Sequence, residues 1–146
     1  MTDVEAMIIA QEGTGPIVKG RFMPYRDSVG KYTVGYGRCI EDIGISPEEA
    51  RMLLKSDIMI AVNDARRLCS FFEELSRPRQ LVLISMAYNL GYTGLSEWPR
   101  FWDAMHMRDW EGAAFHIMDS KAAREDAPAR YLHLAHMMRS DVSQWV

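Results

Sequence analysis

The sequence lacks any apolar run near the roughly 18 residues that a membrane-spanning helix needs. Its N-terminal stretch carries Asp3 and Glu5 where a secretion signal carries positive charge, and the apolar run there is short. These absences predict a chain with no signal peptide and no stable membrane insertion, which stays in the cytoplasm of the cell that makes it. A substrate outside the cytoplasm would then be reached only after lysis or by a separate export route.

Cysteines and clustered metal ligands are also scarce, and the chain has no net positive charge. Cys39 and Cys69 are the only cysteines and form no CxxC pair, so reduced thiols are favoured over a disulfide. A net charge of −3 argues against a general nucleic-acid-binding protein. Only His133 and His136 are closely spaced histidines, and no carboxylate or thiol cluster accompanies them. We therefore expect neither a metal site nor a cofactor.

The charge that is present is unevenly distributed. Residues 13–38 contain five basic residues against Asp27 alone, whereas residues 41–57 are acidic. A basic segment in an acidic protein fits an anionic ligand, but scattered solvated charges explain it equally well. The length of 146 residues, with 48% apolar and 25% charged residues, is that of one globular domain.

Hydrophobic periodicity predicts a mostly helical α+β fold with one small region of β-structure. Residues 3–12 are predicted as a short helix that ends at Gly13. The segment YTVGYG, residues 32–37, alternates Tyr and Val with Thr and Gly, which indicates a strand. Gly30 before it indicates a hairpin turn.

A long amphipathic helix is predicted over about 47–68, because Ser46 can cap it and Glu49 can complete a capping box. The run LVLISMAYNL is apolar nearly all round, which indicates a buried helix ended by Gly91. Shorter helices are predicted near 99–107, 109–119 and 128–139. One domain with three parts is expected: a β-lobe at about 13–45, the linking helix at about 47–68 and a helical lobe at about 70–146.

Three residues near the N-terminus have the chemical character of a glycosidase site. Glu12 ends the first predicted helix, where the helix dipole and partial burial against the second lobe would keep its carboxyl protonated as a general acid. Asp27 lies at the mouth of the hairpin beside basic residues, which favours its ionised form. Thr33 lies on a strand face otherwise formed by glycines, where a ligand can approach closely. Taken alone, such residues more often have ordinary structural roles.

The same residues resemble the active-site segment of the phage-type lysozymes, glycoside hydrolase family 24. In that family a Glu-Gly precedes an Asp, and a Thr follows after five further residues; Glu12-Gly13 and PYRDSVGKYTVGYGR, with Asp27 and Thr33, keep this pattern. The resemblance continues in order through ISPEEARMLLKSDIMIAV, LVLISMAYNLGYTGL, DWEGAAFHIMDS and AREDAPARYLHLAHMM, and so covers most of the chain.

The chain also departs from that family. The segment between Glu12 and Asp27 is longer than usual, which is expected to lengthen the β-lobe. The connection CIEDIG is short, so a small helix that is usual at this place is expected to be absent. The better-known members are basic, whereas this chain is slightly acidic, so its attraction to anionic wall polymers would be local and weaker.

The resemblance implies a two-lobed lysozyme-like fold and a peptidoglycan hydrolase, an endolysin that causes host-cell lysis. It would cleave, with inversion, the β-1,4 bond between N-acetylmuramic acid and N-acetylglucosamine. Glu12 would protonate the leaving oxygen, Asp27 would activate or orient a water molecule, and Thr33 would help to hold that water. The implied partner is the glycan strand of peptidoglycan in the periplasm, reached by a monomer from the host cytoplasm with the help of a holin.

Supporting residues are assigned on the same basis. The expected substrate-binding residues are Gly35, Tyr36, Asn89 and Arg130. Asn89 can instead be a helix C-cap, and Arg130 would also steady Glu12. Arg38 and Asp57 are expected to form an ion pair, although two unpaired surface charges are equally compatible with the sequence.

Two other functions stay open. A lytic transglycosylase needs only the acid and closes an internal anhydro ring, so a water-holding pair such as Asp27 and Thr33 argues against it. A catalytically inactive, lysozyme-shaped wall-binding protein is the second alternative, and the retention of all three candidate residues argues against it.

Overall fold

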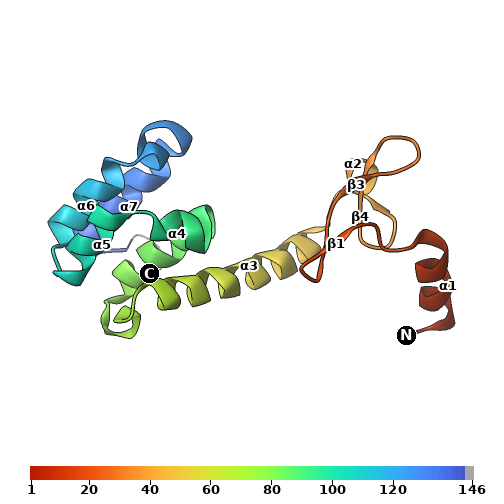
Figure 1. Cartoon of the computed structure of the whole chain (residues 1–146), viewed down its shortest axis with the longest axis horizontal. Helices are drawn as coiled ribbons and strands as arrows, with labels where there is room; N and C mark the ends of the chain where they lie inside the picture. The colour runs from red at the N-terminus through yellow and green to blue at the C-terminus, as the bar shows by residue number, and fades with distance from the viewer. Residues whose placement is uncertain (144–146) are drawn as a thin grey trace. The chain divides into compact units, whose positions relative to one another are not determined.

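The computed structural model describes residues 1–143 of the chain (Figure 1). It is a mostly helical α+β protein with small antiparallel strands near the N-terminus, which confirms the predicted fold class. Contacts between Cα atoms divide the chain into two compact units, Met1–Met52 and Leu53–Val146.

The first unit begins with helix α1, Asp3–Glu12, as the periodicity predicted. A capping box starts it: the Thr2 hydroxyl accepts from the amide of Glu5 at 3.1 Å, and the Glu5 carboxylate accepts from the amide of Thr2 at 2.5 Å. Gly13 follows at φ 70°, a conformation that glycine adopts without a Cβ penalty. The helix therefore ends with Glu12 as its last residue.

Five short strands follow, in two antiparallel sheets. The first sheet is a hairpin that the sequence did not predict, and the second has the order β3-β4-β5. Thr33 lies in the central strand and is paired with Tyr25 on one side and Cys39 on the other. The strands are β1 Ile17–Val18, β2 Arg21–Phe22, β3 Tyr25–Arg26, β4 Tyr32–Val34 and β5 Arg38–Cys39.

The strand predicted over residues 32–37 is shorter than expected, because β4 ends at Val34 and a turn leads into β5. Gly35 at φ 64° and Gly37 at φ 78° explain the difference, since neither has the negative φ of an extended strand. The alternation of residue types therefore continued beyond the point at which the backbone turned.

A short helix, α2 (Ile40–Ile43), directly follows β5, and Gly44 ends it. The expectation that the connection CIEDIG holds no helix is therefore wrong. Helix α3, Pro47–Leu68, then has the bounds that the sequence predicted. Its capping box is present: the amide of Glu49 donates to the Ser46 hydroxyl at 3.2 Å, and the amide of Ser46 donates to the Glu49 carboxylate at 2.7 Å.

The second unit contains the hydrophobic core, into which α4 to α7 all contribute. Gly91, at φ 70° and ψ 173°, breaks α4 where the sequence predicted the buried helix to end, and a shorter helical piece continues to Ser96. The Trp102 indole donates to the carbonyl oxygen of Leu95 at 2.9 Å. The elements are η1 Phe72–Glu74, α4 Arg77–Ser96, α5 Pro99–His106, α6 Trp110–Met118, the π-helical turn η2 Ala122–Asp126 and α7 Pro128–Ser140.

Candidate active site

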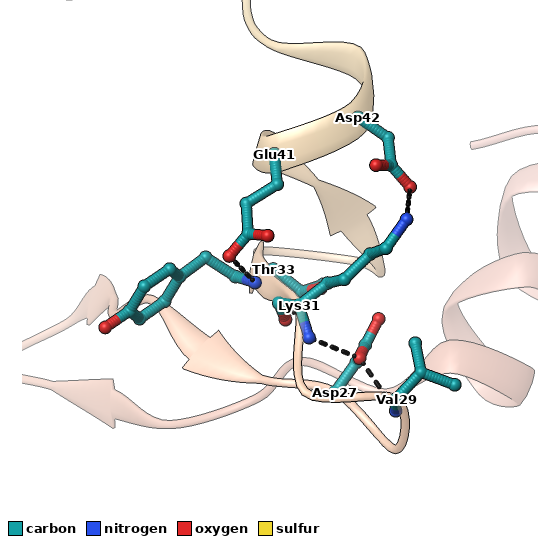
Figure 2. Close-up of polar contacts among 7 residues, drawn as sticks. Asp27, Val29, Lys31, Thr33, Glu41 and Asp42 are labelled. Atoms are coloured by element: carbon teal, nitrogen blue, oxygen red, sulfur yellow. Dashed lines mark hydrogen bonds and ion pairs between the residues drawn. The ribbon is translucent and has the colours of Figure 1, made fainter.

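Asp27 is anchored in the turn between β3 and β4 by its own side chain. Its Oδ1 accepts hydrogen bonds from the amides of Val29 and Lys31, both at 2.9 Å, and its amide donates to the carbonyl oxygen of Lys31 at 2.9 Å. Figure 2 shows the two bonds converging on one carboxylate oxygen. Within residues 1–143 no hydrogen bond to Oδ2 is found, so that oxygen is available to a water molecule.

Thr33 is the one buried polar residue among those that the structure describes, with 3% of its surface exposed. Its hydroxyl donates to the carbonyl oxygen of Lys31 at 3.3 Å, and the same oxygen accepts from the amide of Asp27. Thr33 and Asp27 are thus joined through one backbone carbonyl. The open face expected around Thr33 is not present at this residue, because Thr33 is only 3% exposed and the glycines belong to the following turn.

Glu12, the last residue of α1, lies against the turn between β4 and β5. A Cβ atom added to Gly37 would stand 2.6 Å from Glu12 Oε2 and 3.0 Å from its Cγ, so only glycine leaves the carboxylate its present position. The side chain itself is exposed. No hydrogen bond or ion pair joins Glu12 to Asp27 or Thr33 in the described part of the chain. Glu12 lies against the turn that follows β4, whereas Asp27 lies in the turn that precedes this strand.

Arg38 has a different partner from the one predicted. Its guanidinium forms a two-pronged ion pair with Glu49, at 2.9 Å and 3.0 Å, and donates twice to the carbonyl oxygen of Gly44. The expected Arg38–Asp57 pair is corrected accordingly. Glu49 is in the first turn of α3, whereas Asp57 is about 12 Å further along that helix, given a rise of roughly 1.5 Å per residue.

Tyr36 lies in the same turn as Gly35 and Gly37 and is about half exposed. Its ring meets the edge of Phe22 at a centroid distance of 5.2 Å. It also borders a largely apolar cavity of about 440 Å³ on α1, whose other lining residues are Met1, Val4, Glu5, Ile8 and Ile9.

Asn89 and Arg130 belong to the second unit. The buried Tyr131 hydroxyl donates to Asn89 Oδ1 at 2.7 Å and joins α4 to α7; burial raises the pKa of this tyrosine. This bond uses the side-chain oxygen of the exposed Asn89, and no hydrogen bond from its amide nitrogen is found within residues 1–143. Asn89 is not a C-cap, because the helix continues to the break at Gly91. Arg130 is exposed and borders a separate cavity of about 370 Å³ between α3, α4 and α7.

Lys31 contacts both Asp27 and Thr33, and no role of its own was predicted for it from the sequence. Its amide and carbonyl both bond to Asp27, its carbonyl also bonds to Thr33, and its ammonium group pairs with Asp42 at 2.5 Å. The contact raises the pKa of Lys31 and lowers that of Asp42, chiefly through their hydrogen bond. No local sequence pattern predicts that the backbone of one residue will bond to both Asp27 and Thr33, because these bonds depend on how the hairpin closes.

Two other features, a membrane-spanning helix and a metal-binding cluster, are not found in the part of the chain that the structure describes. No helix in residues 1–143 is both long and apolar enough to cross a membrane. The same residues contain no group of three or more histidine, cysteine, aspartate or glutamate side chains placed to hold a metal ion.

Comparison with known families adds to this geometry. The model of the phage lysozyme family matches residues 18–127, which is most of the chain. The match includes Asp27, Thr33 and Asn89, whereas Glu12 and Arg130 lie outside it. No curated protein matches the chain. The chain therefore belongs to the phage lysozyme family, glycoside hydrolases that act on peptidoglycan as muramidases and lyse the host cell.

Proposed function

We propose that Glu12 and Asp27 are the catalytic pair of this lysozyme and that it hydrolyses the glycan by inversion. Glu12 protonates the glycosidic oxygen that leaves, and Asp27 orients and activates the attacking water. The observation that carries this proposal is the anchoring of Asp27: two backbone amides hold Oδ1, and Oδ2 is left for the water. A carboxylate fixed in this way costs little further ordering when the water attacks.

Thr33 has a different part in this proposal from the one that the resemblance implied. Its hydroxyl is buried and donates to the Lys31 carbonyl, which also accepts from Asp27. We therefore propose that Thr33 positions the Asp27 loop and does not bind the water directly. A valine at this position would fill the same space but could not donate to that carbonyl.

The substrate-binding roles of four exposed or partly exposed residues remain part of the proposal. Gly35 leaves its backbone open to a ligand, since no atom lies within 4 Å of a Cβ placed on it. Tyr36 beside it contributes an exposed aromatic ring. Asn89 presents an amide whose orientation Tyr131 fixes, and Arg130 presents a cation. Amides, aromatic rings and cations suit a glycan that carries acetamido and carboxylate groups.

The cellular setting is proposed on the family's lysis function. The protein is a monomer that folds as one domain, and it stays in the host cytoplasm until a holin gives it access to the periplasm. It takes no cofactor and binds no nucleic acid in this proposal. The bond cleaved is the β-1,4 link from N-acetylmuramic acid to N-acetylglucosamine.

The test compares wild type with Glu12→Gln and Asp27→Asn in the clearing of Gram-negative cells stripped of their outer membrane. Loss of a general acid is expected to slow clearing by about 10²–10⁴-fold, and loss of the Asp27 carboxylate to slow it comparably. Glu97→Gln is the matched control, because Glu97 also stands at the end of a helix, and it should clear cells like wild type.

The mass of the products separates the two possible reactions. Hydrated muramic acid ends are expected, and anhydro ends would show a transglycosylase in which Asp27 has no water to activate. Full activity of Glu12→Gln would contradict its assignment as the acid. Thr33→Val should keep wild-type wall binding while clearing more slowly.

A further inference from the structure

Helix α2 places two acidic side chains on the hairpin that carries Asp27 (Figure 2). Asp42 Oδ2 pairs with Lys31 Nζ at 2.5 Å, and Glu41 Oε1 accepts from the amide of Tyr32 at 3.0 Å. Two consecutive residues of α2 thus bind two consecutive residues of the hairpin. Because α2 directly follows β5, which is paired with β4, these contacts connect the far side of the sheet to the Asp27 loop.

The residue held in this way is the one on which Asp27 depends. The Lys31 amide donates to Asp27 Oδ1 at 2.9 Å, and its carbonyl oxygen accepts from the amide of Asp27 at 2.9 Å. A rotation of the Lys31 backbone would therefore disturb two of the hydrogen bonds that hold Asp27. The ammonium group of Lys31 reaches α2, where it pairs with Asp42.

We propose that Asp42 and Glu41 are positioning residues for the reaction: they hold Lys31 and Tyr32, and through them the Asp27 carboxylate, in the orientation that the attacking water needs. This inference rests on the proposed role of Asp27. Neither α2 side chain touches the reacting atoms, so their removal lowers kcat by misplacing Asp27 and leaves substrate binding nearly unchanged.

The hydrogen bond between Lys31 and Asp42 favours the charged form of both side chains. The hydrogen bond from Lys31 lowers the pKa of Asp42 below its ordinary 3.8, and the bond to Asp42 raises the pKa of Lys31 above its ordinary 10.5. The contact is consequently lost only as the pH falls through the lowered pKa of Asp42 or rises through the raised pKa of Lys31. Between these limits both partners are charged and the ion pair can form.

An ordinary exposed ion pair provides the matched comparison. The Asp119 carboxylate pairs with Arg124 at 3.0 Å and has 52% of its side chain exposed, against 53% for Asp42. Exposed pairs of this kind contribute little to stability. Asp119→Asn therefore removes the same chemical group at the same exposure but leaves the hairpin untouched.

The experiment uses the full-length protein with purified Gram-negative peptidoglycan as substrate. We expect Asp42→Asn to lower kcat about three- to tenfold with KM within about twofold of wild type, and the double variant Glu41→Gln/Asp42→Asn to lower kcat further. Asp42→Glu, which keeps the charge, should recover most of the loss. Asp119→Asn should match wild type.

Amide hydrogen exchange gives a readout that does not depend on activity. The Lys31 amide, which donates to Asp27, is expected to exchange several-fold faster in Asp42→Asn than in wild type or Asp119→Asn, with an unchanged melting temperature. If kcat and this exchange rate are the same in Asp42→Asn and Asp119→Asn, the inference is overturned.

One further variant, Asp27→Asn, separates the inference from the function on which it rests. Asp27→Asn must be nearly inactive if Asp27 has its proposed role. Wild-type activity in Asp27→Asn would overturn both that role and the positioning of catalysis by α2. Inactive Asp27→Asn together with a fully active Asp42→Asn would overturn the inference alone.

Discussion

The two units of the chain are stabilised in different ways. Of residues 1–143, every buried apolar residue lies in Leu53–Val146, whereas Thr33 is the single buried residue of Met1–Met52. The second unit is organised by packing around α4 to α7. The first is organised by turns, caps and ion pairs, among them the Asp27 turn and the Arg38–Glu49 pair.

This difference explains where the candidate catalytic residues lie. Glu12 and Asp27 are both in the first unit, where a carboxylate can be anchored by backbone amides without being surrounded by a hydrophobic core. Burial of a charge in a packed core would require a partner and would cost several kcal/mol without one. The first unit therefore holds the Asp27 carboxylate by hydrogen bonds, and the second unit contributes the packed hydrophobic core.

The largest expected effect on the free energy of unfolding comes from replacing isoleucine by alanine in the second unit, and the same replacement in the first unit is the comparison. Ile117 is fully buried in α6, and Ile17 is 53% exposed in β1. Ile117→Ala should lower the free energy of unfolding by about 2–5 kcal/mol, because it removes buried methyl groups and leaves a cavity. Ile17→Ala should change it by less than about 1 kcal/mol. Urea unfolding measures both, and equal losses would contradict the contrast.

The two cysteines sharpen the comparison, since each unit contains one free thiol. Cys69 is 1% exposed, and burial raises its pKa to about 11. At pH 8 its thiolate fraction should be lower by roughly two orders of magnitude than that of an ordinary thiol with a pKa near 8.5. In the variant Cys39→Ser, a disulfide reagent should therefore react slowly until urea unfolds the chain. Rapid reaction of the native variant would show that the core at Cys69 opens readily.

The last prediction concerns two glycines of the first unit, where the expected loss of stability is smaller than that of Ile117→Ala. Gly37 and Gly20 have φ values of 78° and 75°, so an alanine at either should cost about 1–2 kcal/mol of unfolding free energy through backbone strain. Only Gly37→Ala also displaces the Glu12 carboxylate, because nothing stands within 4 Å of a Cβ on Gly20. Gly37→Ala should thus clear cells about tenfold or more slowly, while Gly20→Ala retains activity. Equal activity of the two variants would remove Gly37 from the site.

Elements with strong local signals were predicted correctly from the sequence. The bounds of α3 follow from Ser46, Glu49 and a sustained apolar stripe, and the break in α4 follows from Gly91. The two-strand hairpin at residues 17–22 and the four-residue helix α2 were missed. Such short elements have too few residues to show a period, and contacts with the rest of the unit decide them.

The candidate site was likewise predicted only in part: the sequence named its residues but not their contacts. Glu12, Asp27 and Thr33 were selected from residue type, spacing and the resemblance to a family. Their surroundings were not: the resemblance led us to expect Arg38 to pair with Asp57, whereas the structure pairs it with Glu49, and no role was assigned to Lys31. Hydrogen bonds between residues distant in sequence depend on which strands pair and in which register, and local patterns do not contain that information.

The sequence by itself determined the fold class, the bounds of α3, the break in α4 at Gly91 and the family, because helix caps, apolar periodicity and motif spacing are local properties of the chain. Only the tertiary structure decided that Lys31 links Asp27 to Thr33 and that α2 holds Lys31. The physical reason is that these contacts form only after β3, β4 and β5 have paired and brought residue 42 to residue 31.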